Sequence, residues 1–150
     1  EETTAPLAEA ADFEDNYDGL CSYFAKLGYI ATKDGEIDND KVTKMDASLV
    51  GAKEGKKFTA TNNGKAVTIE LYEYDLNNLN DTAKSVIDSV KKDGSFVILD
   101  LPAVTAYLSD NGKYMMIYTD NSIDKKNPDE NSDSYKHREQ VIESFKEFHK

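Results

Sequence analysis

The dipeptide Asn63-Gly64, in the middle of the segment KKFTATNNGKAVTIELYEYD, constrains the fold of this chain more than any other feature. Both positions of a tight two-residue turn need a positive φ, which asparagine and glycine tolerate best, so the dipeptide predicts a β-hairpin. The predicted pairs are Ala60–Val67, Phe58–Ile69 and Lys56–Leu71 on one face, and Thr59–Thr68 and an ion-paired Lys57–Glu70 on the other. One apolar face and one polar face are typical of an antiparallel sheet that is covered on one side.

A second hairpin is predicted by Asn111-Gly112 in the segment AVTAYLSDNGKYMMIYT. Its pairs are Leu108–Met115 and Ala106–Ile117 on one face, and Tyr107–Met116, Thr105–Tyr118 and Ser109–Tyr114 on the other. Neither face is polar, so this hairpin either lies between two layers or exposes a surface of tyrosine and methionine. The short apolar run SFVILDL, residues 95–101, suits a central strand that ends at Pro102.

Apolar residues at helical spacing predict three helices. They cover 12–28, which ends at Gly28, then 79–93, which is capped by Asn80 or Asn78 and ends at Gly94, and 134–150, which is capped by Ser132 or Asp133. Gly19 in the first helix costs about 1 kcal/mol against alanine, so we expect either close packing there or some slack in the helix. Most of 31–47 is polar and aperiodic, which predicts a loop.

Helices interspersed with antiparallel strands, without a repeated βαβ unit, predict the α+β class. We expect a sheet of about five strands, built from the two hairpins and one further strand, with three helices packed on it. A chain of 150 residues predicts one domain, here residues 12–150, after a flexible acidic lead-in at 1–11.

The charge of the chain limits its partners. It has 29 acidic and 18 basic residues, a net charge of −11, which disfavours nucleic acid and anionic lipid surfaces. Arg138 is the only arginine, so bidentate recognition of phosphate is limited to one position. Cys21 is the only cysteine and lies on an apolar helix face, which predicts a small buried side chain.

The acidic segment TDNSIDKKNPDENSDSYKHRE, residues 119–139, is the candidate for a metal site. Asp129, Asn131 and Asp133 match positions 1, 3 and 5 of a helix-loop-helix calcium loop, but Ser134 and Gln140 replace its glycine and its glutamate. A solvated surface loop is therefore favoured, with weak Ca²⁺ binding as the alternative. His137 and His149 lie about 120° apart around the last helix, which argues against a zinc site.

No catalytic residue is predicted. The chain has no GxSxG elbow, no HExxH and no phosphate-binding glycine loop, and an apolar setting makes Cys21 a poor nucleophile. A chain with 29 acidic residues always allows a carboxylate pair, so a small hydrolase or metal-dependent enzyme stays as the alternative function.

Five tyrosines are the candidate binding surface. By strand alternation Tyr72 and Tyr74 point away from the apolar face of the first hairpin, and Tyr107, Tyr114 and Tyr118 share one face of the second. If these faces are open and continuous, they form an aromatic surface for a protein, peptide or glycan. The alternative, which the sequence favours, is that a helix covers them.

The run SLVGAKEGKKFTATNNGKAVTIELYEYD, the later DNGKYMMIYTD and the closing ESFKEF resemble a group of uncharacterised secreted or lipid-anchored α+β proteins of Gram-positive bacteria. The matching positions are Val50-Gly51-Ala52, Gly55, residues 70–75 and Asn111-Gly112-Lys113. The resemblance implies an extracellular or cell-envelope location, normally through a lipid anchor in the precursor. It supplies no catalytic residue that could be carried over to this chain. We therefore expect a non-enzymatic binding module at the cell surface, with a structural spacer as a further alternative.

Overall fold

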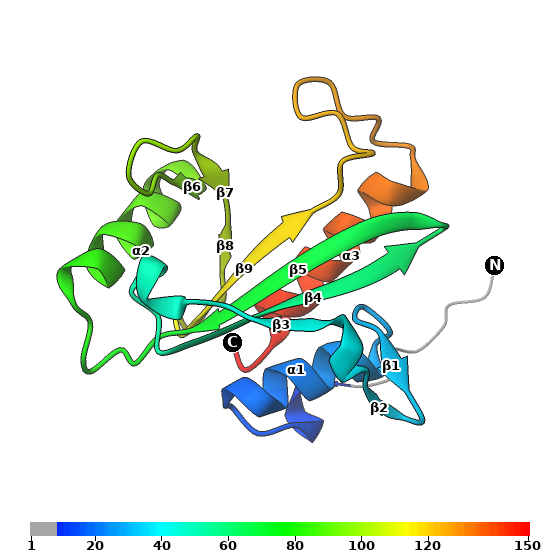
Figure 1. The fold of residues 1–150 in the computed structure, drawn as a ribbon, viewed down its shortest axis with the longest axis horizontal. Coiled ribbons are helices and arrows are strands. Elements are labelled where there is room, and N and C mark those ends of the chain that lie inside the picture. Colours follow the sequence, from blue (N-terminus) through cyan, green and yellow to red (C-terminus); the bar gives the residue numbers. More distant parts are fainter. Residues whose placement is uncertain (1–8) are drawn as a thin grey trace.

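The computed structural model, which describes residues 9–150, is an α+β structure with three α-helices and a five-stranded antiparallel sheet (Figure 1). The coarse fold prediction is confirmed. The helices are α1 (Tyr17–Lys26), α2 (Asp81–Asp93) and α3 (Asp133–Glu147). The sheet has the order β3 (Val42–Lys44), β4 (Glu54–Asn62), β5 (Lys65–Glu73), β9 (Tyr114–Thr119) and β8 (Tyr107–Leu108).

Two small sheets and three 3₁₀ helices complete the described part of the chain. The strand β1 (Thr32–Lys33) pairs with β2 (Glu36–Ile37), and β6 (Ser95–Phe96) pairs with β7 (Val104–Thr105). The 3₁₀ helices are η1 (Ala10–Asp12), η2 (Asn39–Lys41) and η3 (Ala47–Val50). The predicted loop at 31–47 is therefore wrong in part, because it contains β1, β2 and β3.

The long hairpin β4–β5 has the register that the Asn63-Gly64 turn predicts. Phe58 lies opposite Ile69, and both turn residues have a positive φ, 52° and 76°. Lys57 lies opposite Glu70, but no ion pair joins them in the described structure. Glu70 instead accepts a hydrogen bond from the hydroxyl of Tyr72 at 2.6 Å.

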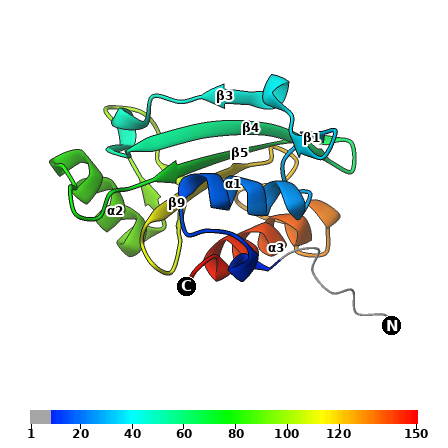
Figure 2. The ribbon, with the colours of Figure 1, turned by 90° about the horizontal axis from the view of Figure 1, so that it is seen from below.

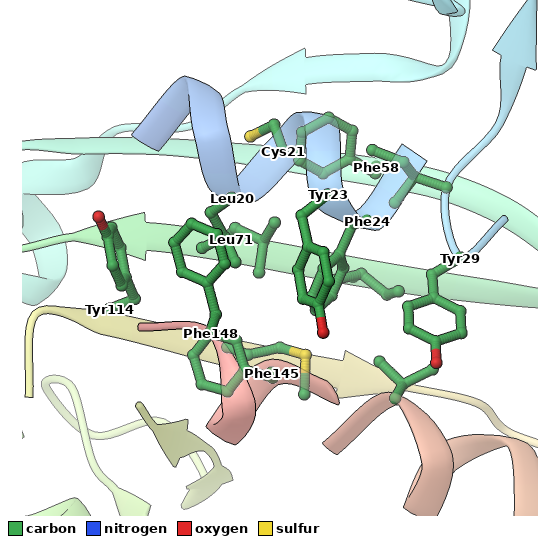
Figure 3. Packing of buried hydrophobic residues seen from close by; sticks show 14 of the residues in the cluster. Leu20, Cys21, Tyr23, Phe24, Tyr29, Phe58, Leu71, Tyr114, Phe145 and Phe148 are labelled. Atoms are coloured by element: carbon green, nitrogen blue, oxygen red, sulfur yellow. The ribbon is translucent and has the colours of Figure 1, made fainter. Parts of the chain in front are cut away.

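Two apolar cores lie on opposite faces of the sheet. The α1/α3 core joins both helices to the strand residues Phe58, Ile69, Leu71 and Met116 (Figures 2 and 3). The α2 core joins α2 and Val50 to side chains on the other face of the same strands, which include Tyr72 and Met115. The sheet is thus covered on both faces at the end where α2 lies, whereas Thr59 and Thr61 on β4 are exposed.

The helices form where the apolar spacing predicts them, but α1 is shorter. It begins after Asn16, whose side chain accepts a hydrogen bond from the backbone of Gly19 at 2.7 Å, so Phe13 lies outside it. A Cβ atom on Gly19 would overlap the backbone carbonyl of Glu14, so the expected close packing is confirmed. The helix α2 has Asn80 as its N-cap and a left-handed Gly94 after its last turn.

The predicted central strand at 95–101 is wrong. Only Ser95 and Phe96 are extended, and they pair with Thr105 and Val104. Thr105 pairs with Ser95 and the ladder between β8 and β9 starts at Tyr107, so the predicted pair Thr105–Tyr118 does not form. The fifth strand of the sheet is β3, which pairs with β4.

The predicted lead-in at 1–11 lies mostly outside the described residues, and its last two residues begin η1. Within residues 9–150, no helix combines the length and the apolar character needed to cross a bilayer.

Candidate functional site

The five candidate tyrosines do not form an open face. Tyr72, Tyr74, Tyr114 and Tyr118 are buried and Tyr107 is half-buried. The register between β5 and β9 sets Tyr72 opposite Met115 and Leu71 opposite Met116, so Tyr72 and Tyr74 lie in the α2 core and Tyr114 and Tyr118 in the α1/α3 core. The predicted aromatic binding surface is therefore wrong, because the two groups point to opposite faces and helices cover both.

Internal partners hold most of the tyrosine hydroxyls, as buried hydroxyls require. Tyr74 donates to the carbonyl of Val50 at 2.8 Å, and Tyr114 donates to Oδ1 of Asp15 at 2.7 Å. Burial raises the pKa of Tyr72, Tyr74, Tyr114 and Tyr118 far above its ordinary value of 10.0. These tyrosines seal the two cores.

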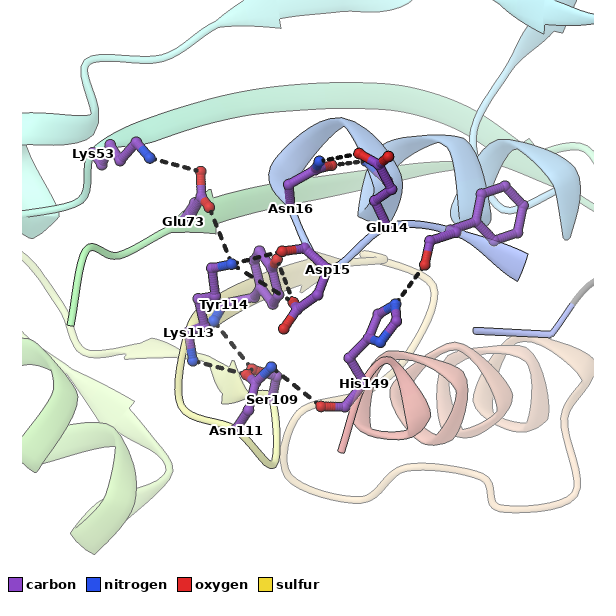
Figure 4. Close-up of polar contacts among 12 residues, drawn as sticks. Glu14, Asp15, Asn16, Lys53, Glu73, Ser109, Asn111, Lys113, Tyr114 and His149 are labelled. Atoms are coloured by element: carbon purple, nitrogen blue, oxygen red, sulfur yellow. Dashed lines mark hydrogen bonds and ion pairs between the residues drawn. The ribbon is translucent and has the colours of Figure 1, made fainter. Parts of the chain in front are cut away.

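A polar cluster surrounds the buried carboxylate of Glu73, at one end of the α1/α3 core (Figure 4). Nζ of Lys53 and Nζ of Lys113 each lie 3.8 Å from a carboxylate oxygen of Glu73. Nζ of Lys113 also donates to the backbone carbonyl of Asp15 at 2.7 Å. The cluster thus ties the residues before α1 to β5 and β9.

The geometry of this cluster is that of a structural contact. Each carboxylate has a lysine beside it, and the cation of Lys113 lies 5.4 Å from the ring centre of Tyr114. Asp15, Glu73, Lys113 and Tyr114 line none of four surface grooves with volumes from about 480 to 610 Å³.

The aspartates of 119–139 cap turns of their own backbone. Oδ1 of Asp120 accepts from the backbone of Ser122 at 2.9 Å, and Oδ1 of Asp124 accepts from the backbone of Lys126 at 2.8 Å, which lowers the pKa of Asp124. This is the ordinary turn chemistry of aspartate. It accounts for one carboxylate oxygen of each aspartate, whereas Oδ2 of Asp120 is buried and has no hydrogen-bond partner among the described residues.

The two aspartates of the calcium alternative also accept hydrogen bonds, Asp129 within its own turn and Asp133 from a distant side chain. Oδ1 of Asp129 accepts from the backbone of Asn131 at 3.0 Å, and Asp133 accepts from Asn63 at 3.3 Å at the start of α3. Residues 9–150 contain no group of three or more His, Cys, Asp or Glu side chains placed to hold a metal ion.

The remaining reactive side chains are separate from one another. Cys21 is buried, and desolvation raises the pKa of its thiol to about 12, which makes it a poor nucleophile. His137 packs between the rings of Tyr29 and Tyr118, and burial lowers its pKa. Nε2 of His149 lies 2.6 Å from the carbonyl of Phe13, so the two histidines do not meet.

The exposed side chains that need an explanation are aliphatic. We define the apolar surface as Leu49, Val97, Leu99 and Leu101, which are 55%, 58%, 83% and 60% exposed. It borders a groove of about 480 Å³ between η3, the first turns of α2 and the loop after β6. The groove is lined by Ser48, Leu49, Asp81, Thr82, Ser85, Val86, Val97, Ile98 and Leu99.

Local contacts hold the loop 97–101, which we term the apolar loop, in this position. Phe96 is buried in the α2 core and pairs with Val104, so the two ends of the loop are fixed (Figure 1). Ile98 packs on that core, and its carbonyl accepts a hydrogen bond from the backbone N–H of Leu101 at 3.1 Å. These contacts turn Leu99 outward between them.

Leu99 has a left-handed backbone, with φ of 54°. A residue with a side chain pays about 1–2 kcal/mol for that conformation, and glycine or asparagine would adopt it more readily. Leu99 is also the most exposed of the large apolar side chains in the described structure. Backbone strain and exposed apolar area thus coincide at Leu99.

The sequence did not indicate the apolar loop as a candidate site, because a continuous apolar run predicts a buried strand. Two signals in the run argue against a central strand: Asp100 lies inside it, and Pro102 follows at once. Leu49 carries no signal of its own, because a single apolar residue in a polar segment is ordinary.

Comparisons of the chain with known protein families, with curated proteins and with solved structures find no match. The resemblance to secreted or lipid-anchored proteins therefore stays an expectation.

Proposed function

We propose that this chain is a non-enzymatic binding module that docks a segment of another protein on the apolar surface. The observation that supports this most is Leu99, a strained and exposed leucine at the edge of a groove. A folded domain gains nothing by itself from such a residue, whereas burial against a partner would remove its apolar side chain from water.

The chemistry of the surface favours a protein segment over a glycan or a membrane. Sugar rings stack on exposed aromatic side chains, and no aromatic residue lines the groove. Anionic bilayers repel a chain with a net charge of −11. The resemblance to secreted and lipid-anchored proteins supports a place for this module outside the cytoplasm, at the cell envelope.

A selection of random displayed peptides tests the proposal. Peptides are selected on the immobilised wild-type chain and then measured on Leu99→Asn, since asparagine accepts a left-handed backbone and keeps the loop in place. Burial of a leucine side chain contributes about 1.5–3 kcal/mol, so loss of Leu99 should weaken binding about tenfold or more.

Leu76→Asn is the matched control, because Leu76 is also an exposed leucine, at 48%, but does not line the groove. Peptides should bind this variant and the wild type equally. Peptides that bind Leu99→Asn as tightly as the wild type, or selections that yield no peptide dependent on Leu99, would overturn the proposal.

A further inference from the structure

We infer that the docked segment is positively charged, with lysine or arginine beside its apolar residues, and that Asp81 and Asp100 contact these cations. The inference rests on the proposed function and adds the chemical class of the partner.

The groove and the apolar loop each carry one acidic residue. Asp81 is the only charged residue that lines the groove, and Asp100 is exposed in the apolar loop. Lys84 follows Asp81 by three positions on α2, about 60° around the helix axis, and no ion pair joins the two among residues 9–150. The groove and the apolar loop beside it therefore offer two carboxylates to a partner.

The carboxylates of Asp81 and Asp100 are also free. Nearby aspartates are engaged, because Asp46 accepts from the backbone and the hydroxyl of Ser48, and Asp75 accepts from the backbone of Asn77. Among the hydrogen bonds and ion pairs of residues 9–150, none involves the side chain of Asp81 or Asp100.

The two free aspartates differ in whether a role in the fold accounts for their charge. Asp81 occupies the first turn of α2, where a negative charge stabilises the positive end of the helix. Asp100 has no helix to stabilise and interrupts an otherwise apolar run. Asp100 is therefore the sharper test of contact with a cation.

Charge affects both the affinity and the association rate of binding. An exposed ion pair contributes about 0.2–1 kcal/mol, which corresponds to a change of roughly 1.5- to 5-fold in affinity. The net charge of −11 also attracts a basic segment over a longer range and raises its association rate at low salt.

The test uses peptides that are selected as above and depend on Leu99. They should be enriched in lysine and arginine, and copies in which glutamine replaces these residues should bind more weakly. Affinities are measured on the wild type, Asp100→Asn and the double variant Asp81→Asn/Asp100→Asn, at about 50 mM and about 500 mM salt. Asp88→Asn is the control, since Asp88 is exposed on α2 but does not line the groove.

We expect Asp100→Asn to weaken binding about 2- to 5-fold at low salt and less at high salt, because salt screens exposed charges. The double variant should lose more, and Asp88→Asn should match the wild type. Unfolding by urea should show that Asp100→Asn is as stable as the wild type.

Other results would overturn the inference in distinguishable ways. Peptides that need Leu99 but carry no basic residue, with no effect of Asp100→Asn, would refute the charge and leave the proposed function standing. A failure to find any peptide that needs Leu99 would refute both. If the chain forms a concentration-dependent dimer that Leu99→Asn abolishes, the partner on the apolar surface is a second copy of the chain. If the chain binds uncharged phosphatidylcholine vesicles and this binding needs Leu99, the partner is a lipid bilayer.

Discussion

The two faces of the central sheet differ in how far helices cover their apolar residues. On one face α1 and α3 bury a continuous aromatic core, in which Tyr23 stacks on Phe148 at 5.4 Å and Phe24 lies 6.3 Å from Phe145 (Figure 3). On the other face α2 covers Tyr72 and Tyr74 but leaves the apolar surface open. The tyrosines, which are common in binding sites, are sealed, and aliphatic side chains are exposed.

This difference separates stability from binding. Most large buried rings belong to the α1/α3 core, so changes there should affect the free energy of unfolding. The apolar surface contributes little to folding because its side chains stay in water. Changes there should alter binding and leave the fold intact. Four experiments test this separation, and we describe them from the largest expected effect to the smallest.

Alkaline titration tests whether the tyrosines are buried away from solvent. Burial raises the pKa of Tyr17, Tyr72, Tyr74, Tyr114 and Tyr118 far above 10.0, the value expected in the unfolded chain. Above pH 10 the unfolded chain loses these protons and the folded chain keeps them, so stability falls by about 1.4 kcal/mol per pH unit for each tyrosine. Below pH 10 their contribution is fully present.

We therefore expect cooperative unfolding between about pH 10 and pH 12, because the stability of a domain is only about 5–15 kcal/mol. Tyrosinate absorbance and circular dichroism should change together. Gradual ionisation of these tyrosines near pH 10, with the fold retained, would mean that the aromatic faces are open and would remove the contrast.

Truncation of the aromatic core is the next largest effect. Phe24→Ala should lower the free energy of unfolding by about 3–5 kcal/mol, because it leaves a cavity among fully buried rings. Urea denaturation measures this, and Leu99→Ala is the matched change on the apolar surface, with an expected effect below about 1 kcal/mol. Equal losses in the two variants would contradict the separation of stability from binding.

A glycine pair tests how η3 and α2 pack beside the groove. Gly51 has φ of 71°, and a Cβ atom there would overlap the backbone of Ala83. Gly51→Ala should cost about 2–4 kcal/mol, from the left-handed backbone and from overpacking. Gly64→Ala has the same backbone cost but open space around it, so its loss should be about 1–2 kcal/mol. If both variants lose the same free energy of unfolding, the close packing of η3 on α2 does not contribute to stability.

The smallest effect on stability is expected at Leu99. Leu99→Asn should keep or raise the free energy of unfolding, by up to about 1 kcal/mol, because asparagine tolerates the left-handed backbone. Urea denaturation of this variant and of the wild type measures the difference. A loss above about 1.5 kcal/mol would show that Leu99 stabilises the fold itself, and the case for a binding role would lose its main support.

The sequence by itself determined the features that depend on neighbours along the chain. The Asn63-Gly64 turn specifies the register of β4 and β5 because its backbone conformation aligns the flanking strands. Gly94 specifies the end of α2 through its left-handed backbone, and the sequence narrowed the N-cap to Asn78 or Asn80, of which the structure has Asn80. The four residues that α2 buries, Ala83, Val86, Ile87 and Val90, recur at helical spacing in the sequence.

Only the tertiary structure decided which apolar residues meet water. The pairing of β5 with β9 sends the two groups of tyrosines to opposite faces, and these strands lie more than forty residues apart in sequence. Likewise, the pairing of Phe96 with Val104 turns the apolar loop outward, although its residues match the composition of a buried strand. Burial depends on which distant segments cover a side chain, and local spacing carries no information about those segments.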